Sequence, residues 1–188
     1  PSSGALVDGT RADMVVAGAG LTGMATAALL ARSGLTVVVL EARTVGAVTT
    51  GNTTAKLSLL QGTVLSDIAS HQPDGVLRAY VEAQREGQAW LARFMDDREV
   101  PYQRRDAYTF ATTPKGEKKL RAELDAGTAA GLDLIWVDET ELPLAAKAIK
   151  LPDQVQIHPL LVLQELVDEV IAHGISYWVH LAEARLSV

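Results

Sequence analysis

A glycine-rich turn between two apolar segments constrains the fold of this chain more than any other stretch. Residues 12–43 read ADMVVAGAGLTGMATAALLARSGLTVVVLEAR, in which an apolar run ends at Gly18 and a helical pattern of apolar residues follows Gly23. A second apolar run, rich in valine, covers residues 35–40 and ends at Glu41. This pattern predicts a buried strand, a tight turn, a helix and an interior parallel strand.

The three glycines of this turn have the spacing of a dinucleotide-binding loop. Gly18 permits a tight exit from the strand, Gly20 lets the backbone approach a pyrophosphate, and Gly23 lets the helix pack close to the sheet. Glu41 follows at nearly the expected spacing of about 20 residues, where a carboxylate accepts hydrogen bonds from a ribose diol. An acid at this position disfavours a 2′-phosphate, so FAD or NAD is preferred over NADP. The alternative is a glycine-rich turn in another kind of α/β protein.

The composition narrows the class of protein. The 188 residues are 48% hydrophobic and 21% charged, which suits one α/β domain, or one domain plus part of another. The formal net charge of −6 argues against a nucleic-acid-binding surface. The chain has no cysteine and its four histidines lack ligand spacing, so no metal site is predicted. Glycines and Arg32 interrupt the apolar stretch 14–40 and residues 1–11 do not resemble a signal peptide, so we expect a cytoplasmic protein without a membrane span.

A threonine-rich stretch follows the second predicted strand. Residues 44–61, TVGAVTTGNTTAKLSLLQ, suit a loop better than a helix. A cofactor lying across the carboxyl edge of the sheet would meet several hydrogen-bonding groups there, namely the hydroxyls of Thr49, Thr50, Thr53 and Thr54, the amide of Asn52 and the ammonium of Lys56. An ordinary surface loop is the alternative.

Residues 12–43, followed by TTGNTTAK at 49–56, resemble the amino-terminal part of FAD-dependent oxidoreductases of the D-amino-acid oxidase and glycine oxidase (DAO) type. The chain is most similar to a bacterial subgroup in which a Rieske iron–sulfur domain follows the flavin domain. The resemblance implies that Leu21 and Thr22 contact the pyrophosphate, that Glu41 holds the adenosine ribose, that Ala42 and Arg43 flank the adenine, and that the 49–56 loop runs along the ribityl chain and flavin. The cofactor-binding residues expected are therefore Gly18, Ala19, Gly20, Leu21, Thr22, Gly23, Glu41, Ala42, Arg43, Thr49, Thr50, Asn52, Thr53, Thr54, Ala55 and Lys56.

The remainder of the chain predicts alternating helices and strands. An amphipathic helix is expected over 74–97 with Asp74 as its N-cap, and two strands over 100–103 and 107–111. Arg104 and Arg105, which join these strands, would attract a carboxylate substrate or, as the alternative, are solvated edge-strand residues. A helix is expected from Thr113 to Gly131, a strand over 132–137, irregular or short strands over 139–151, a helix opened by His158 and a final strand within 174–188.

The predicted fold is α/β: a Rossmann-like FAD/NAD(P)-binding domain with a parallel sheet, plus part of a mixed-sheet substrate domain. We expect a disordered lead at 1–11, an FAD-binding unit at 12–98, a substrate-domain segment at 99–157 and a return to the FAD-binding domain at 158–188, which is incomplete. The strands at 101–113, PYQRRDAYTFATT, resemble the first strands of the family's substrate domain.

The resemblance implies an FAD-dependent oxidoreductase, or the amino-terminal fragment of one, that transfers a hydride from an amine or amino-acid-like substrate to the flavin. The isoalloxazine carries such chemistry, so no catalytic acid or base is nominated. Two alternatives stay open: a non-catalytic nucleotide-binding remnant or interaction module, and an NAD-dependent oxidoreductase. A Rieske domain would lie outside this chain, because such a cluster needs cysteine ligands.

Overall fold

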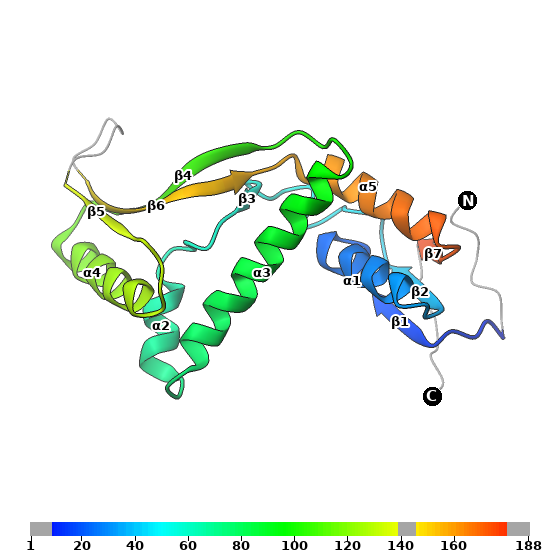
Figure 1. The fold of residues 1–188 in the computed structure, drawn as a ribbon, viewed down its shortest axis with the longest axis horizontal. Helices are drawn as coiled ribbons and strands as arrows, with labels where there is room; N and C mark the ends of the chain where they lie inside the picture. The colour runs from blue at the N-terminus through cyan, green and yellow to red at the C-terminus, as the bar shows by residue number, and fades with distance from the viewer. Residues whose placement is uncertain (1–8, 139–145, 180–188) are drawn as a thin grey trace. The chain divides into compact units, whose positions relative to one another are not determined.

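The computed structural model describes residues 9–138 and 146–179, which form two compact units (Figure 1). Among the described residues, the first unit combines 9–55 with 158–179, and the second comprises 56–138 and 146–157. Residues 56–98 pack within the second unit and not within the first. Their predicted role in an FAD-binding range of 12–98 stays a prediction.

The first unit contains a parallel sheet with the strand order β1-β2-β7. The central strand is buried, as its run of valines predicts, and the parallel pairing on both of its sides confirms the expected α/β architecture. The elements of this unit are β1 (Met14–Ala17), α1 (Leu21–Arg32), β2 (Val37–Glu41), α5 (Pro159–Ala172) and β7 (Ser176–Val179).

The prediction that the first strand is buried is wrong for β1. Met14 is 43% exposed and Val15 is 46% exposed. Within the described part of the chain, β1 pairs with β2 on one edge only.

Asp13 and Thr36 join the beginnings of these two strands: the Thr36 N–H donates to Asp13 Oδ2 (2.8 Å), and the Asp13 N–H donates to Thr36 Oγ1 (3.0 Å). The Thr36 hydroxyl and N–H hold the pKa of Asp13 below its ordinary value.

Helices α1 and α5 pack against each other in the first unit. An ion pair of 2.5 Å between Arg32 Nε and the buried carboxylate of Glu169 connects their ends. Small and aliphatic side chains fill the interior, including Met24, Ala27, Ala28, Val162, Leu166 and Val170, all of which are fully buried.

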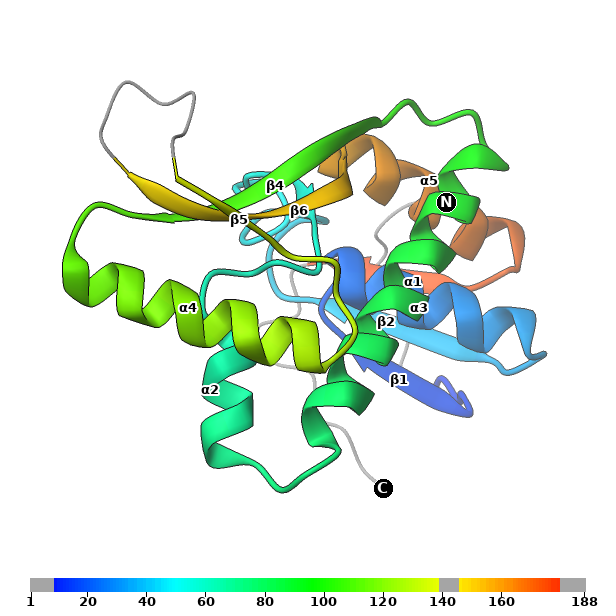
Figure 2. The same ribbon diagram turned by 60° about the vertical axis from the view of Figure 1, so that its left-hand side comes forward.

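The second unit is organised around one long strand. That strand, β6, pairs antiparallel with each of the other three strands, β3, β4 and β5. Helix α4 contacts β4 and β6, while α2 contacts α3 and α4 (Figure 2). The elements are β3 (Lys56–Leu57), α2 (Val64–His71), α3 (Val76–Asp96), β4 (Gln103–Ala111), α4 (Pro114–Ala129), β5 (Ile135–Val137) and β6 (Lys147–Gln156).

Two strand predictions in this unit are wrong. The segments 100–103 and 107–111 do not form two strands, because β4 runs continuously from Gln103 to Ala111. The stretch expected to be irregular contains the start of β6, a ten-residue strand that continues through Pro152. The register shifts opposite Arg105 and Ala107, and Asp153 has a φ of +56°, which identifies a β-bulge. A bulge accommodates a proline because its missing N–H is not needed in the ladder.

Helix ends in the two units are set by side-chain and backbone caps. The expected starts after Thr113 and His158 are confirmed, since both side chains accept a hydrogen bond from a first-turn N–H. The expectation for Asp74 is wrong: α3 begins after Gly75, which adopts a left-handed φ of +92° and replaces a side-chain cap.

No helix in the described residues has the combined length and apolarity that a membrane span requires.

One buried carboxylate connects two helices of the second unit. Glu123 of α4 is fully buried, and its two oxygens accept the N–H groups of Leu65 (3.0 Å) and Ser66 (2.7 Å). These N–H groups belong to the first turn of α2, where backbone donors lack partners within the helix. Glu123 therefore caps α2 from a distant part of the chain.

Candidate functional site

The loop between β1 and α1 has the backbone geometry that its glycines predict. Gly18 has a φ of +101°, a conformation that favours glycine, and its N–H donates to Leu40 O of β2 (2.7 Å). A Cβ added at Gly23 would lie 1.9 Å from Gly18 O, so no larger residue fits there without moving the backbone. The loop and the first turn of α1 are therefore held close together.

Glu41 lies at the end of β2 with its carboxylate directed at this loop. Its Oε2 accepts the N–H of Ala19 (2.8 Å), and its Oε1 accepts the N–H of Arg43 (2.8 Å). An ionised carboxylate has about four lone-pair sites, so each oxygen retains capacity for a further donor. Glu41 is thus able to fix the loop and to accept hydrogen bonds from a diol at the same time.

Thr50 lies over the amino terminus of α1, a position that the sequence does not reveal because 29 residues separate it from its partner. Its Oγ1 accepts the N–H of Leu21 (3.1 Å), and its side chain is buried. A Cβ added at Gly20 would lie 3.0 Å from the same Oγ1. Since this hydroxyl already accepts a bond, its own proton is available to a neighbouring anion.

The segment 44–55 contains no helix or strand and forms turns over 45–52, as expected of a loop. The N–H of Gly46 donates to Ala19 O (3.1 Å), which fastens the segment to the glycine loop. Other predicted ligand-binding groups are used locally: Asn52 Nδ2 donates to Val48 O (2.6 Å), and Thr53 Oγ1 accepts the N–H of Ala55 (3.3 Å). Thr49 and Thr54 are exposed, and so are Ala42 and Arg43.

The structure therefore brings part of the predicted site together. The residues from Gly18 to Gly23, Glu41 with the Arg43 backbone, and Thr50 form one hydrogen-bonded group in the first unit. Lys56 is the first residue of the second unit, in β3. Its predicted role as a cofactor ligand remains a prediction.

The geometry of this group suits a pyrophosphate. Gly20 is the N-cap of α1 and has no side chain to cover the helix terminus, while the first turn of α1 carries no acid. No hydrogen-bond acceptor for the N–H of Gly20 is found among the described residues. Free N–H groups and the positive end of the helix dipole attract phosphate groups. The residues present therefore fit the diphosphate and the ribose of a dinucleotide.

The fold and the loop define a dinucleotide-binding protein of the α/β class, and comparison with known proteins specifies the family. The family model described as FAD dependent oxidoreductase (DAO) matches residues 13–180. The chain belongs to this family, whose cofactor is FAD.

Similar proteins include YhfW of Bacillus subtilis (strain 168), which is named as a Rieske 2Fe-2S iron-sulfur protein. It is 29% identical over 177 residues, which are 93% of this chain and 35% of YhfW. Glycine oxidase from Bacillus cereus ATCC 14579 has a similar fold, with a TM-score of 0.68 at 14% identity over 90% of this chain and 48% of that one. The L-α-glycerophosphate oxidase from Mycoplasma pneumoniae, solved with FAD bound, gives a TM-score of 0.66 at 15% identity over 90% and 44%. The chain thus spans about a third to a half of the length of these proteins.

Proposed function

We propose that this chain forms the cofactor-binding part of an FAD-dependent oxidoreductase that removes a hydride from an amine or amino-acid-like C–H bond. The observation that carries this proposal is the group formed by the glycine loop, Glu41 and Thr50. When bound, FAD supplies the hydride acceptor. Family membership supports the flavin chemistry, and the amine substrate is our choice among those named for its structural neighbours, which include a glycine oxidase and a glycerophosphate oxidase.

We assign the chain's own residues as follows. The N–H groups at the start of α1 and the hydroxyl of Thr50 bind the pyrophosphate, and the carboxylate of Glu41 binds the adenosine ribose. Arg43, which is exposed beside Glu41, flanks the adenine, as the family resemblance implies. These residues bind and orient the cofactor, and none of them is proposed as a catalytic acid or base.

Titration of the purified chain with FAD tests this assignment. We expect the visible spectrum and the fluorescence of FAD to change on binding, and the Gly20→Val variant to bind at least tenfold more weakly, because its side chain would occupy the path of the pyrophosphate. Gly87→Val is the matched control, since a Cβ added at Gly87 of α3 would have no atom within 4 Å. Absence of FAD binding at excess cofactor, or equal affinity of both variants, would refute the assignment. Preferential binding of NADH would favour an NAD-dependent enzyme instead.

We further propose that the electrons pass from the flavin to a Rieske centre outside residues 1–188. The name of YhfW supports this acceptor, and the absence of cysteine from this chain means that its ligands must come from elsewhere. Electron paramagnetic resonance of the full-length gene product, reduced with substrate, would show a reduced [2Fe–2S] signal. A flavin that reduces while no cluster signal appears would contradict the acceptor and leave the FAD proposal intact.

A further inference from the structure

Thr50, whose hydroxyl lies over the amino terminus of α1, belongs to a largely exposed segment. Gly46 and Thr50 are the two buried residues of the stretch 44–54, and the others are exposed or half-buried. A loop of this kind has little packing of its own to hold a side chain in one place. The position of the Thr50 hydroxyl therefore depends on what contacts these two buried residues.

Gly46 connects the segment to the glycine loop and to the neighbour of Thr50. Its N–H donates to Ala19 O (3.1 Å), and its own carbonyl oxygen accepts the N–H of Gly51 (2.9 Å). A Cβ added at Gly51 would lie 2.8 Å from Gly46 O, so this turn has no room for a side chain at that position. Thr50 is thus held directly beside the bond that closes the turn.

Helix α5 packs directly on Gly46. A Cβ added at Gly46 would have three nearest atoms, namely Leu163 Cδ2 at 2.6 Å, Leu160 Cδ2 at 3.4 Å and Thr50 Cγ2 at 4.0 Å. Leu163 is only 3% exposed, so its side chain has little freedom to move aside. Its methyl group occupies the space that any larger residue at position 46 would need.

The methyl group of Thr50 relates this contact to the hydroxyl. Threonine is branched at Cβ, so its Cγ2 and Oγ1 move together when χ1 rotates. Cγ2 lies 4.0 Å from the Cβ position of Gly46, while Oγ1 accepts the N–H of Leu21 (3.1 Å). A Cβ added at Gly20 would lie 3.0 Å from the same Oγ1. Displacing the methyl group would therefore move the hydroxyl away from the helix terminus.

We propose that Gly46 and Leu163 are positioning residues for the dinucleotide. Leu163 fills the space beside the missing side chain of Gly46, and together they hold the Thr50 hydroxyl where it donates to a phosphate oxygen. Both act through Thr50 and not by contact with the phosphate. This inference rests on the proposed function, because it requires a phosphate beside Thr50. It adds that the binding site depends on α5, which begins more than a hundred residues after the glycine loop.

Fluorescence titration of the purified 188-residue chain with FAD tests this inference. Gly46→Ala should weaken FAD binding by roughly three- to tenfold, because the charge-assisted hydrogen bond from Thr50 would be lost in part. Gly174→Ala is the matched control and should leave the affinity unchanged. Gly174 has a φ of +73°, against +72° at Gly46, but a Cβ added there would have no atom within 4 Å. Since the backbone strain is the same, a difference between the variants comes from the contacts at Gly46.

A second pair of variants changes α5 instead of the loop. Leu163→Ala removes the side chain that packs on Gly46, while Leu166→Ala removes a fully buried leucine of the same helix that supplies none of the three nearest atoms. Both should lower the urea midpoint of unfolding, since each leaves a cavity. Only Leu163→Ala should weaken FAD binding, again by roughly three- to tenfold. The NMR spectrum of each variant reports whether it is folded before the titration.

A double-mutant cycle distinguishes positioning from a general loss of stability. Thr50→Val keeps the shape of the side chain and removes the hydroxyl, so it should weaken FAD binding by itself. In that background Gly46→Ala should have no further effect on the affinity, because the group that Gly46 positions is gone. Hydrogen exchange gives a readout without cofactor: the Leu21 amide should exchange faster in Gly46→Ala than in Gly174→Ala.

Equal FAD affinity of Gly46→Ala and Gly174→Ala would overturn the inference while the FAD proposal stands. Equal effects of the two leucine substitutions on FAD affinity, or additive effects of Gly46→Ala and Thr50→Val, would overturn it as well. A wild-type chain that binds no FAD at excess cofactor would instead refute the proposed function, and this inference with it. The two failures are therefore distinguishable.

Discussion

Replacing Glu41 by Gln separates the two tasks that the structure gives this side chain. The carboxylate accepts two backbone N–H groups at 2.8 Å, one from Ala19 and one from Arg43. A glutamine of the same shape has one acceptor oxygen, so one of these donors would face an NH₂ group instead. Loss of one partly buried acceptor costs about 1–3 kcal/mol of folding stability.

The same substitution changes the proposed hydrogen bonds to the ribose. A bond to a charged group contributes about 1 kcal/mol more than a bond to a neutral one. Two ribose hydroxyls therefore predict a loss of about 2 kcal/mol, which corresponds to a roughly 30-fold weaker affinity for FAD.

Urea unfolding of the chain without cofactor measures the first effect, and titration with FAD measures the second. Glu86→Gln is the matched control, because Glu86 is exposed on α3 and surface changes of this kind stay within about 0.5 kcal/mol. An unchanged unfolding midpoint for the Glu41 variant would refute the role in holding the loop. Unchanged FAD affinity in a correctly folded variant would refute the role at the ribose.

Three further predictions concern the stability of the two units. Gly23→Ala should unfold at clearly lower urea concentration than the wild type and bind FAD poorly, because its Cβ would lie 1.9 Å from Gly18 O; unchanged values would contradict the observed contact. Glu123→Gln should destabilise the second unit by about 1–3 kcal/mol and speed hydrogen exchange of the two amides that it caps in α2, and slow exchange at those amides would argue against the cap. Asp13 should titrate below its ordinary value of 3.8, since Thr36 donates to its ionised form. The stability from this contact is present above the pKa of the unfolded chain and is lost as the pH falls through the lower folded value. An NMR titration checks this, and a pKa at or above 3.8 would contradict the contact.

The sequence predicts the conformation of the glycine loop because its determinants are local. Glycines at fixed spacing, a helix that starts directly after them and a β-branched strand are each visible within residues 12–43. Helix starts at Thr113 and His158 are predicted for the same reason, since a cap and the proline after it are neighbours.

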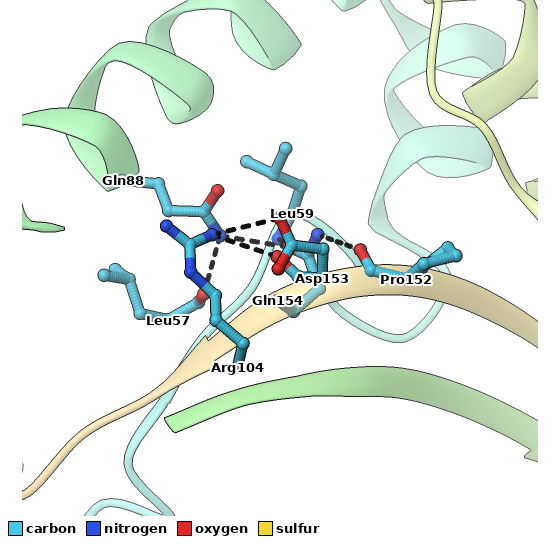
Figure 3. A network of polar contacts seen from close by, with 7 residues as sticks. All are labelled: Leu57, Leu59, Gln88, Arg104, Pro152, Asp153 and Gln154. Carbon is cyan, nitrogen blue, oxygen red and sulfur yellow. Dashed lines mark hydrogen bonds and ion pairs between the residues drawn. The ribbon is translucent and has the colours of Figure 1, made fainter. Parts of the chain in front are cut away.

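Contacts between distant residues explain what the sequence does not predict. The bulge that lets β6 continue through Pro152 depends on its pairing with β4, so proline alone wrongly suggests an interruption. The bond from Leu21 to Thr50 and the capping of α2 by Glu123 join segments that no short pattern relates. Arg104 and Arg105 are neighbours in sequence, yet Arg104 is paired with Asp153 (Figure 3) whereas Arg105 donates to Gln103.

The first unit is built from two segments that are far apart in the chain, and this affects how it folds during synthesis on the ribosome. Strand β2 emerges early, but its second neighbour, β7, follows more than a hundred residues later. Until then the valine-rich edge of β2 has no partner on that side, and open apolar edges promote aggregation. The described strands of the segment 56–157 pair with one another, so this segment is able to fold while the parallel sheet is still incomplete. We expect a shortened chain that ends at residue 157 and has left the ribosome to resist protease in the middle segment, where β6 pairs with β3, β4 and β5, and to remain sensitive at its amino-terminal end.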